Sequence, residues 1–253
     1  RTSTAVMAPE LVKDFGISPV QLGLFGSFYF YFYALLTLPT GLLVDRWGAR
    51  NVISCWVLAG IGAMVFAMAT TFNGALAGRA LIGMGVCFIF VPATKIVATW
   101  FKTNEFGTYS GVLLAVGNIG SLAAAAPLVA VMAAIGWRNT MWAVGIASVI
   151  LAVLALFLIK NKPEDIGGVS IAEIEGIAPV ETAAPVIGIG TALKQIWSNV
   201  NFWYLGILMF FFYGSMMGLQ GLWGGPYLQH VYGFTKAQAG NYLMLIAAGM
   251  IVG

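Results

Sequence analysis

Long apolar runs separated by short polar segments are the main pattern of this sequence. Residues 22–44 and 51–78 contain no charged side chain. An α-helix needs about 20 apolar residues to cross a bilayer, at a rise of about 1.5 Å per residue. The pattern predicts a first helix ending near residue 12, a last one beginning near 237, and spans over 20–44, 51–72, 75–98, 107–133, 139–160 and 199–228.

Composition agrees with many spans rather than one anchor. Hydrophobic residues make up 60% and charged residues 8% of the 253 residues, whereas soluble domains carry about 25% charged residues. The net charge of +3 is spread over the loops and indicates no nucleic-acid partner. Cys55 and Cys87 both lie in apolar runs, and the whole chain has a single histidine, so neither a metal site nor a cofactor is expected. We predict an all-α polytopic membrane protein.

The apolar pattern is interrupted once by a long polar segment. Residues 160–195 gather charged residues, glycines and three prolines, as linkers do. The predicted organisation is a six-helix half over 1–160, a linker over 161–198 and the start of a second half over 199–253. Because the sequence begins without Met and stops inside an apolar run, we expect a fragment without most of its first helix and without its last helices.

Basic residues predict the orientation. The side that holds the loop around Asp45, the loop around Lys102 and the linker carries six basic residues, against three on the other side. Loops rich in Lys and Arg face the cytoplasm. The sequence therefore predicts an inner-membrane protein whose Asp45 loop and linker are cytoplasmic.

The first helix and turn recur later in the chain. A shift of 217 residues places Pro9 on Pro226 and Gly16 on Gly233. Two repeated halves with a substrate site between them are a transporter architecture. Because turns at membrane surfaces favour proline and glycine, chance similarity is the alternative interpretation.

The polar island between the first two complete spans carries a motif. It resembles the G-x-L-x-D-R-x-G-R-R loop between helices 2 and 3 of the major facilitator superfamily, although Asn51 departs from it. The resemblance implies the major facilitator fold and a cytoplasmic latch. We also expect Asp45 to form a charge cluster with Arg46 and Arg50. The alternative is an ordinary basic loop. The matching residues are Gly41, Leu43, Asp45, Arg46, Gly48 and Arg50.

The start of the chain resembles helix 1 of the sugar-phosphate permeases of that family. Arg1 stands eight residues before Pro9, where the resemblance implies an arginine that binds the anionic group of the substrate. A guanidinium offers two parallel hydrogen bonds to carboxylate or phosphate. A snorkelling arginine is the alternative, but this position is about 12 Å along the helix from the proline.

Further candidates follow along the chain. Tyr29, Tyr33 and Thr37 are spaced by four and share one helix face; the resemblance places the last two along the cavity, and aromatic packing is the equal alternative. Arg79 and Lys95 match helix 4 of the same branch: the resemblance implies a structural or coupling role for Arg79 rather than a ligand role, and a place at the inner gate for Lys95. The predicted substrate residues are Arg1, Tyr29, Tyr33, Thr37, Asn118, Gln220 and Trp223, and the predicted gating residues are Gly41, Asp45, Arg46, Gly48, Arg50, Arg79 and Lys95.

Two departures bear on the substrate. The phosphate permeases carry a second arginine where the repeat places Gly218, and a histidine where Gly117 stands. A doubly charged phosphate would lose two charge partners, so a monoanion such as a small carboxylate fits better.

These features favour a secondary transporter that carries a small organic anion or metabolite by alternating access. We expect a monomer in a lipid bilayer, coupled to a proton or a counter-substrate; no phosphate-binding loop for ATP occurs in the sequence. The alternative is a transporter-like sensor or assembly protein that binds a solute without moving it. An enzyme is not expected, because the one histidine has no buried carboxylate partner in the pattern.

Overall fold

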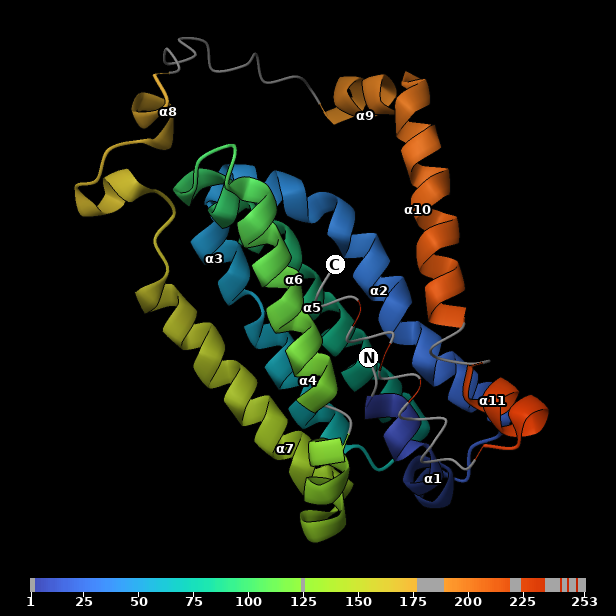
Figure 1. Ribbon diagram of the computed structural model, residues 1–253. Helices are drawn as coiled ribbons and strands as arrows, with labels where there is room; N and C mark the ends of the chain where they lie inside the picture. The colour runs from blue at the N-terminus through green and yellow to red at the C-terminus, as the bar shows by residue number, and fades with distance from the viewer. Residues whose placement is uncertain are drawn as a thin grey trace. The chain divides into compact units, whose positions relative to one another are not determined.

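The computed structural model describes residues 3–123, 126–176, 189–218 and 224–234, with 242, 245 and 249. Nearly all of these residues are helical and none of them lies in a strand. The chain divides into two units, Arg1–Ile177 and Ala178–Gly253, and each is considered by itself (Figure 1). The three-part division into 1–160, 161–198 and 199–253 stays a prediction.

The first unit is a helical bundle. α5 packs against α2 and α4, and α4 also packs against α7. Four stretches are long and apolar enough to cross a membrane: Val20–Trp47, Ala49–Met68, Phe72–Trp100 and Ala130–Leu158. The helices are α1 (Ser3–Phe15), α2 (Pro19–Trp47), α3 (Ala49–Ser54), α4 (Val57–Met68), α5 (Phe72–Trp100), α6 (Phe106–Ala123) and α7 (Ala126–Leu158), followed by the short η1 (Pro163–Ile166) and α8 (Ile171–Ile174).

Capping residues explain where two of the spans begin. At the start of α2, Ser18 Oγ accepts the Gln21 N–H at 3.3 Å, and Gln21 Oε1 accepts the Ser18 N–H at 2.8 Å. At the start of α5, Thr71 Oγ1 accepts the Gly74 N–H at 3.2 Å. This cap makes α5 begin at Phe72, three residues before the predicted boundary at 75.

Some predicted spans do not coincide with single helices. The span predicted over 51–72 consists of α3 and α4, separated at Cys55 and Trp56. The spans predicted over 107–133 and 139–160 map onto α6 and α7. α7 contains a break at Gly136, where φ is 79° and ψ is 158°. Only glycine adopts that backbone readily, so the chain turns at the site where a loop was predicted.

Close approach of α5 to its neighbours depends on two glycines. A Cβ on Gly83 would overlap the backbone of Tyr29 in α2, and a Cβ on Gly85 would overlap the backbone of Ala59 in α4. Small residues permit such contact between membrane helices, where van der Waals packing drives association. These positions hold α2, α5 and α4 together.

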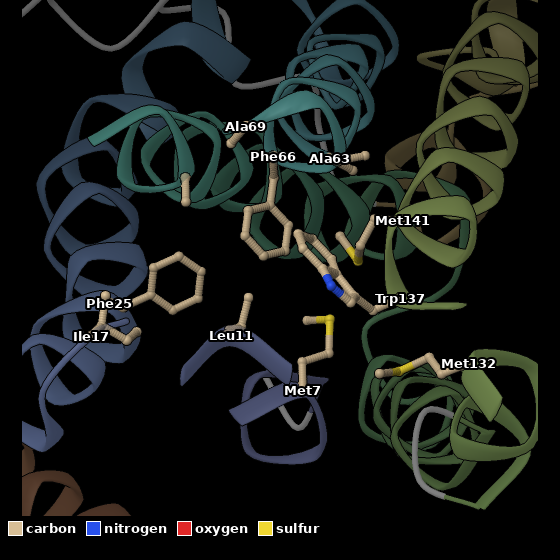
Figure 2. Packing of buried hydrophobic residues seen from close by; sticks show 12 residues of the cluster. Met7, Leu11, Ile17, Phe25, Ala63, Phe66, Ala69, Met132, Trp137 and Met141 are labelled. Carbon is tan, nitrogen blue, oxygen red and sulfur yellow. The ribbon is translucent and has the colours of Figure 1, made fainter. Parts of the chain in front are cut away.

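Buried apolar side chains gather in two clusters. In the larger one, shown in Figure 2, the Phe66 ring lies 5.2 Å from the Trp137 ring and 5.3 Å from the Phe25 ring, with Met7 and Leu11 of α1 beside them. The smaller cluster lies near the junction of α2 and α3. It is made of Val44, Ala49, Val52, Cys87 and Phe88.

The second unit contains α9 (Ile189–Ser198), α10 (Val200–Gly218) and α11 (Gly224–Tyr232). The span predicted over 199–228 covers α10 and the first part of α11, and residues 219–223 lie outside the described residues. The helix continues past the predicted end at 228, to Tyr232. Gly233 follows α11 with φ of 67°, as Gly16 follows α1 with φ of 61°. This shared helix end supports the repeat at a shift of 217 residues.

Candidate functional site

The junction between α2 and α3 is a single residue. Asp45 and Arg46 lie in the last turn of α2, and Gly48 alone separates the two helices, with φ of 80° and ψ of 154°. Its N–H donates to the Val44 carbonyl at 2.9 Å. The expected surface loop is thus shorter than predicted, because the helical hydrogen bonds of α2 continue to Trp47 and only glycine tolerates the turn that follows.

A distant asparagine supports this junction. Asn161 Oδ1 accepts the Arg50 N–H at 2.8 Å, which caps α3 where Gly48 has no side chain to do so. Asn161 and Lys162 each donate a backbone N–H to Asp165 Oδ2, at 3.1 and 3.2 Å. The chain after α7 therefore holds the start of α3. Sequence reasoning missed Asn161, and the only local signal was its place in a polar turn.

Asp45 pairs with Lys95 rather than with the arginines beside it. Lys95 Nζ lies 3.1 Å from Asp45 Oδ1, and both side chains are more than half exposed. The predicted charge cluster is therefore wrong in its partners: the described residues show no ion pair from Asp45 to Arg46 or Arg50. α2 and α5 run together here, which brings position 95 beside position 45.

An open pocket of about 330 Å³ surrounds this ion pair. Three of the predicted gating residues, Gly41, Asp45 and Lys95, line the pocket, because α2, α5 and the start of α6 meet there. Arg46 is exposed, and Arg50 is half-buried with an Nε that has no hydrogen-bond partner among the described residues. The pocket is lined by Gly41, Val44, Asp45, Val91, Thr94, Lys95, Ala98 and Phe106.

The aromatic stripe of α2 is packed, and Arg79 joins it. The Tyr29 and Tyr33 rings stack at 6.0 Å, and Thr37 Oγ1 donates to the Tyr33 carbonyl at 2.6 Å. The buried Arg79 guanidinium lies 5.3 Å from the Tyr29 ring and 5.1 Å from the Phe25 ring. Cations are attracted to aromatic faces at this distance. The sequence did not predict that Arg79 and Tyr29 meet.

Of the other predicted substrate residues, the structure describes only Asn118. Asn118 is partly buried on α6, and no contact described in the structure joins it to Tyr29, Tyr33 or Thr37. Arg1, Gln220 and Trp223 lie outside the described residues. Among the residues that the structure describes, no group of three or more His, Cys, Asp or Glu side chains could hold a metal ion.

The opposite end of the bundle repeats the geometry of the Gly48 junction. The sequences Gly-Ala-Arg-Asn at 48–51 and Gly-Trp-Arg-Asn at 136–139 share the same glycine backbone. In each, the asparagine side chain donates to the carbonyl just before the glycine: Asn51 to Trp47 at 3.0 Å and Asn139 to Ile135 at 2.9 Å. This role gives a physical reason for Asn51, which departs from the loop motif.

Arg138 of α7 contacts the end of α4 and Asp14 of α1 at this second junction. Its Nη1 donates to the carbonyls of Ala67 and Ala69, at 2.9 and 2.6 Å, at the end of α4. Its Nη2 lies 3.5 Å from Asp14 Oδ2, which also accepts the Trp137 Nε1–H at 3.0 Å. Carbonyls at a helix C-terminus lack partners in the helix and favour a cation. Sequence reasoning had not given Arg138 this role.

Apolar helices that lie side by side, with charged junctions at both ends, define a multi-pass helical membrane protein. Comparison with known proteins places it in a family: the model of the Major Facilitator Superfamily matches residues 1–253. The chain therefore belongs to the major facilitator superfamily. Its all-α polytopic fold is the one that the loop motif had implied.

Similar curated proteins carry transporter names. The chain is 26% identical to the uncharacterized transporter YybO of Bacillus subtilis, 24% to the probable sulfoacetate transporter SauU of Cupriavidus necator and 23% to a probable hexose phosphate transport protein of Chlamydia trachomatis. All of this chain aligns in each case, with 60%, 59% and 58% of those proteins. The chain thus spans about three-fifths of their length, and the family and these relatives are transporters, not enzymes.

Proposed function

We propose that this chain is part of a secondary active transporter that carries a small organic anion across the membrane by alternating access. The observation that carries the proposal is the alignment of the whole chain with relatives named as transporters of sulfoacetate and hexose phosphate, both anions. A hexuronate transporter of Bacillus subtilis, 27% identical over 84% of this chain, adds a sugar carboxylate to that set. The proposed substrate is a monoanion such as a small carboxylate, because glycines at 117 and 218 replace the histidine and the second arginine of the phosphate permeases.

The proposed substrate site is built around Arg1, with Tyr29, Tyr33 and Thr37 on α2 and with Asn118, Gln220 and Trp223. The support for α2 is its stacked tyrosines, which place two phenol groups one turn apart. In this proposal Arg1 binds the anion through its guanidinium fork. The Thr37 hydroxyl donates its hydrogen bond to the Tyr33 carbonyl. Toward a substrate, the Thr37 oxygen can therefore act only as an acceptor, for example from a substrate hydroxyl.

Arg1→Ala tests the anion site. The variant is expected to abolish uptake of an anionic substrate into proteoliposomes while the protein level stays unchanged. Arg1→Lys is the matched control: it keeps the charge, loses the bidentate geometry and should retain partial uptake. Uptake by Arg1→Ala at the parent rate would remove Arg1 from the site.

The proposed inner gate is the pocket around Asp45 and Lys95. Their exposed ion pair contributes only about 0.2–1 kcal/mol to stability, so its breaking and forming during a transport cycle costs little. Asp45→Asn should slow the cycle and leave substrate binding nearly unchanged. Lys95→Gln, which removes the other partner, should slow the cycle to a similar degree, and a normal rate in both variants would contradict a gating role.

Transport is distinguished from solute sensing by flux. Protein in sealed vesicles should exchange a labelled internal anion for an external one, whereas a sensor would bind the anion with no exchange. A proton or a counter-substrate is the proposed partner in coupling, and the working unit is proposed to be a monomer. The excess of basic residues supports an inner-membrane orientation in which the Gly48 junction and the linker face the cytoplasm.

A further inference from the structure

α9 has one polar and one apolar face, although it belongs to the segment predicted as a polar linker. Thr191, Lys194, Gln195 and Ser198 follow the spacing i, i+3, i+4 and i+7, so they share one side of the helix. Apolar residue types fill positions 189, 193, 196 and 197 instead. A helix of this kind is too short to span a bilayer and is suited to lie along an interface.

The apolar side carries large exposed groups. Ile196 is 45% exposed and Trp197 is 64% exposed. In water these two side chains would leave a considerable apolar surface unburied beside a charged lysine. A tryptophan with an apolar body and a polar N–H is the residue that membrane interfaces favour.

α9 is fixed to the beginning of an apolar helix. Asn199 alone lies between α9 and α10, and its Oδ1 accepts the Asn201 N–H at 3.0 Å as an N-cap. Trp203 Nε1 donates to the Trp197 carbonyl at 2.9 Å, and the two indole rings meet edge to face at 5.4 Å. Figure 1 shows α9 lying across the end of α10 rather than continuing its axis.

These contacts determine how far α9 can stand from the membrane surface. α10 has 19 residues and a length of about 28 Å, close to the thickness of the hydrocarbon core. One linking residue moves the chain by about 3.8 Å per Cα step. α9 is thus held within a few ångströms of the plane in which α10 begins.

We propose that α9 is an interfacial helix that binds the lipid surface at the end where α10 begins. Ile196 and Trp197 enter the boundary between headgroups and acyl chains, and Lys194 faces the lipid phosphates from the polar side. The partner is a bilayer with anionic headgroups, because the helix joins the apolar α10 directly and carries a cation and no acid. The proposal does not depend on transport.

Depth measurements with spin labels test this. Cysteine is introduced at position 196 or 195, one on each face of the same turn, in a Cys55→Ala background; the buried Cys87 is kept, and protein with no added cysteine gives the background signal. The labelled full chain is reconstituted into vesicles of phosphatidylcholine and phosphatidylglycerol, and the collision rates of oxygen and a water-soluble nickel chelate are compared.

The label at 196 should be reached mainly by oxygen, at a depth of about 5–10 Å below the headgroups, and the label at 195 mainly by nickel. Equal access of nickel to both labels would place α9 in water and overturn the proposal. Low access of both reagents to the label at 196 would show that protein covers the apolar face, and would overturn it as well. A third label at position 191 should repeat the result at 195.

Discussion

Gly48→Ala should destabilise the protein through two separate effects at the junction of α2 and α3. The backbone of Gly48, with φ of 80° and ψ of 154°, lies in a region that only glycine adopts readily, and a non-glycine residue there costs about 1–3 kcal/mol. The new Cβ would also stand 2.8 Å from Asn161 Nδ2 and 2.9 Å from Asn161 Oδ1.

Asn161 must move to relieve that overlap. It would then lose the 2.8 Å hydrogen bond from the Arg50 N–H, which contributes about 0.5–1.5 kcal/mol. The two effects together lower the free energy of unfolding by about 1.5–4.5 kcal/mol. Unfolding by sodium dodecyl sulfate in mixed micelles, followed by circular dichroism, measures this change against the parent protein.

Two variants make the test selective. Gly41→Ala belongs to the same motif, but its Cβ would meet nothing within 4 Å, so its stability should equal or slightly exceed that of the parent. Asn161→Ala should be less destabilising in the Gly48→Ala background than alone, because the clash and the hydrogen bond involve the same side chain. A Gly48→Ala protein within about 0.5 kcal/mol of the parent would refute the reasoning.

Further substitutions probe the packing of the bundle. Arg138→Ala should lower the free energy of unfolding by about 2–4 kcal/mol in the same assay, because it leaves the carbonyls of Ala67 and Ala69 without a charged donor. An unchanged unfolding midpoint would contradict a stabilising role for Arg138. Gly85→Ala should abolish folded protein in detergent, as judged by size-exclusion chromatography, because the methyl group would overlap the Ala59 backbone. Gly107→Ala, where nothing lies within 4 Å, should elute like the parent.

The sequence was informative where a property depends on one residue and its near neighbours. Apolar run length predicted the four stretches that are long and apolar enough to cross a membrane, and the motif predicted that a loop separates the first two of them, where Gly48 joins α2 to α3. Helix ends were displaced by a few residues, since caps such as Thr71 act on the backbone and leave the apolar pattern unchanged.

Contacts between distant segments could not be predicted in the same way. Asp45 was assigned to its neighbours in the chain, whereas packing of α2 on α5 brings Lys95 to it across 50 positions. Asn161 reaches the Arg50 N–H across 111 positions. Arg79 was predicted to be a structural or coupling residue, but its aromatic partners on α2 depend on the close approach at Gly83. Such pairings are properties of the packed bundle.

Initial uptake rates in proteoliposomes, compared for a sugar carboxylate and the corresponding sugar phosphate, test the proposed anion transport most directly. Uptake of the carboxylate should be faster and saturable, and the sugar phosphate should inhibit it only weakly, because one guanidinium at Arg1 suits a monoanion. Tighter binding and faster uptake of the phosphate would contradict the proposed substrate class, and no uptake of any anion by active protein would contradict transport itself.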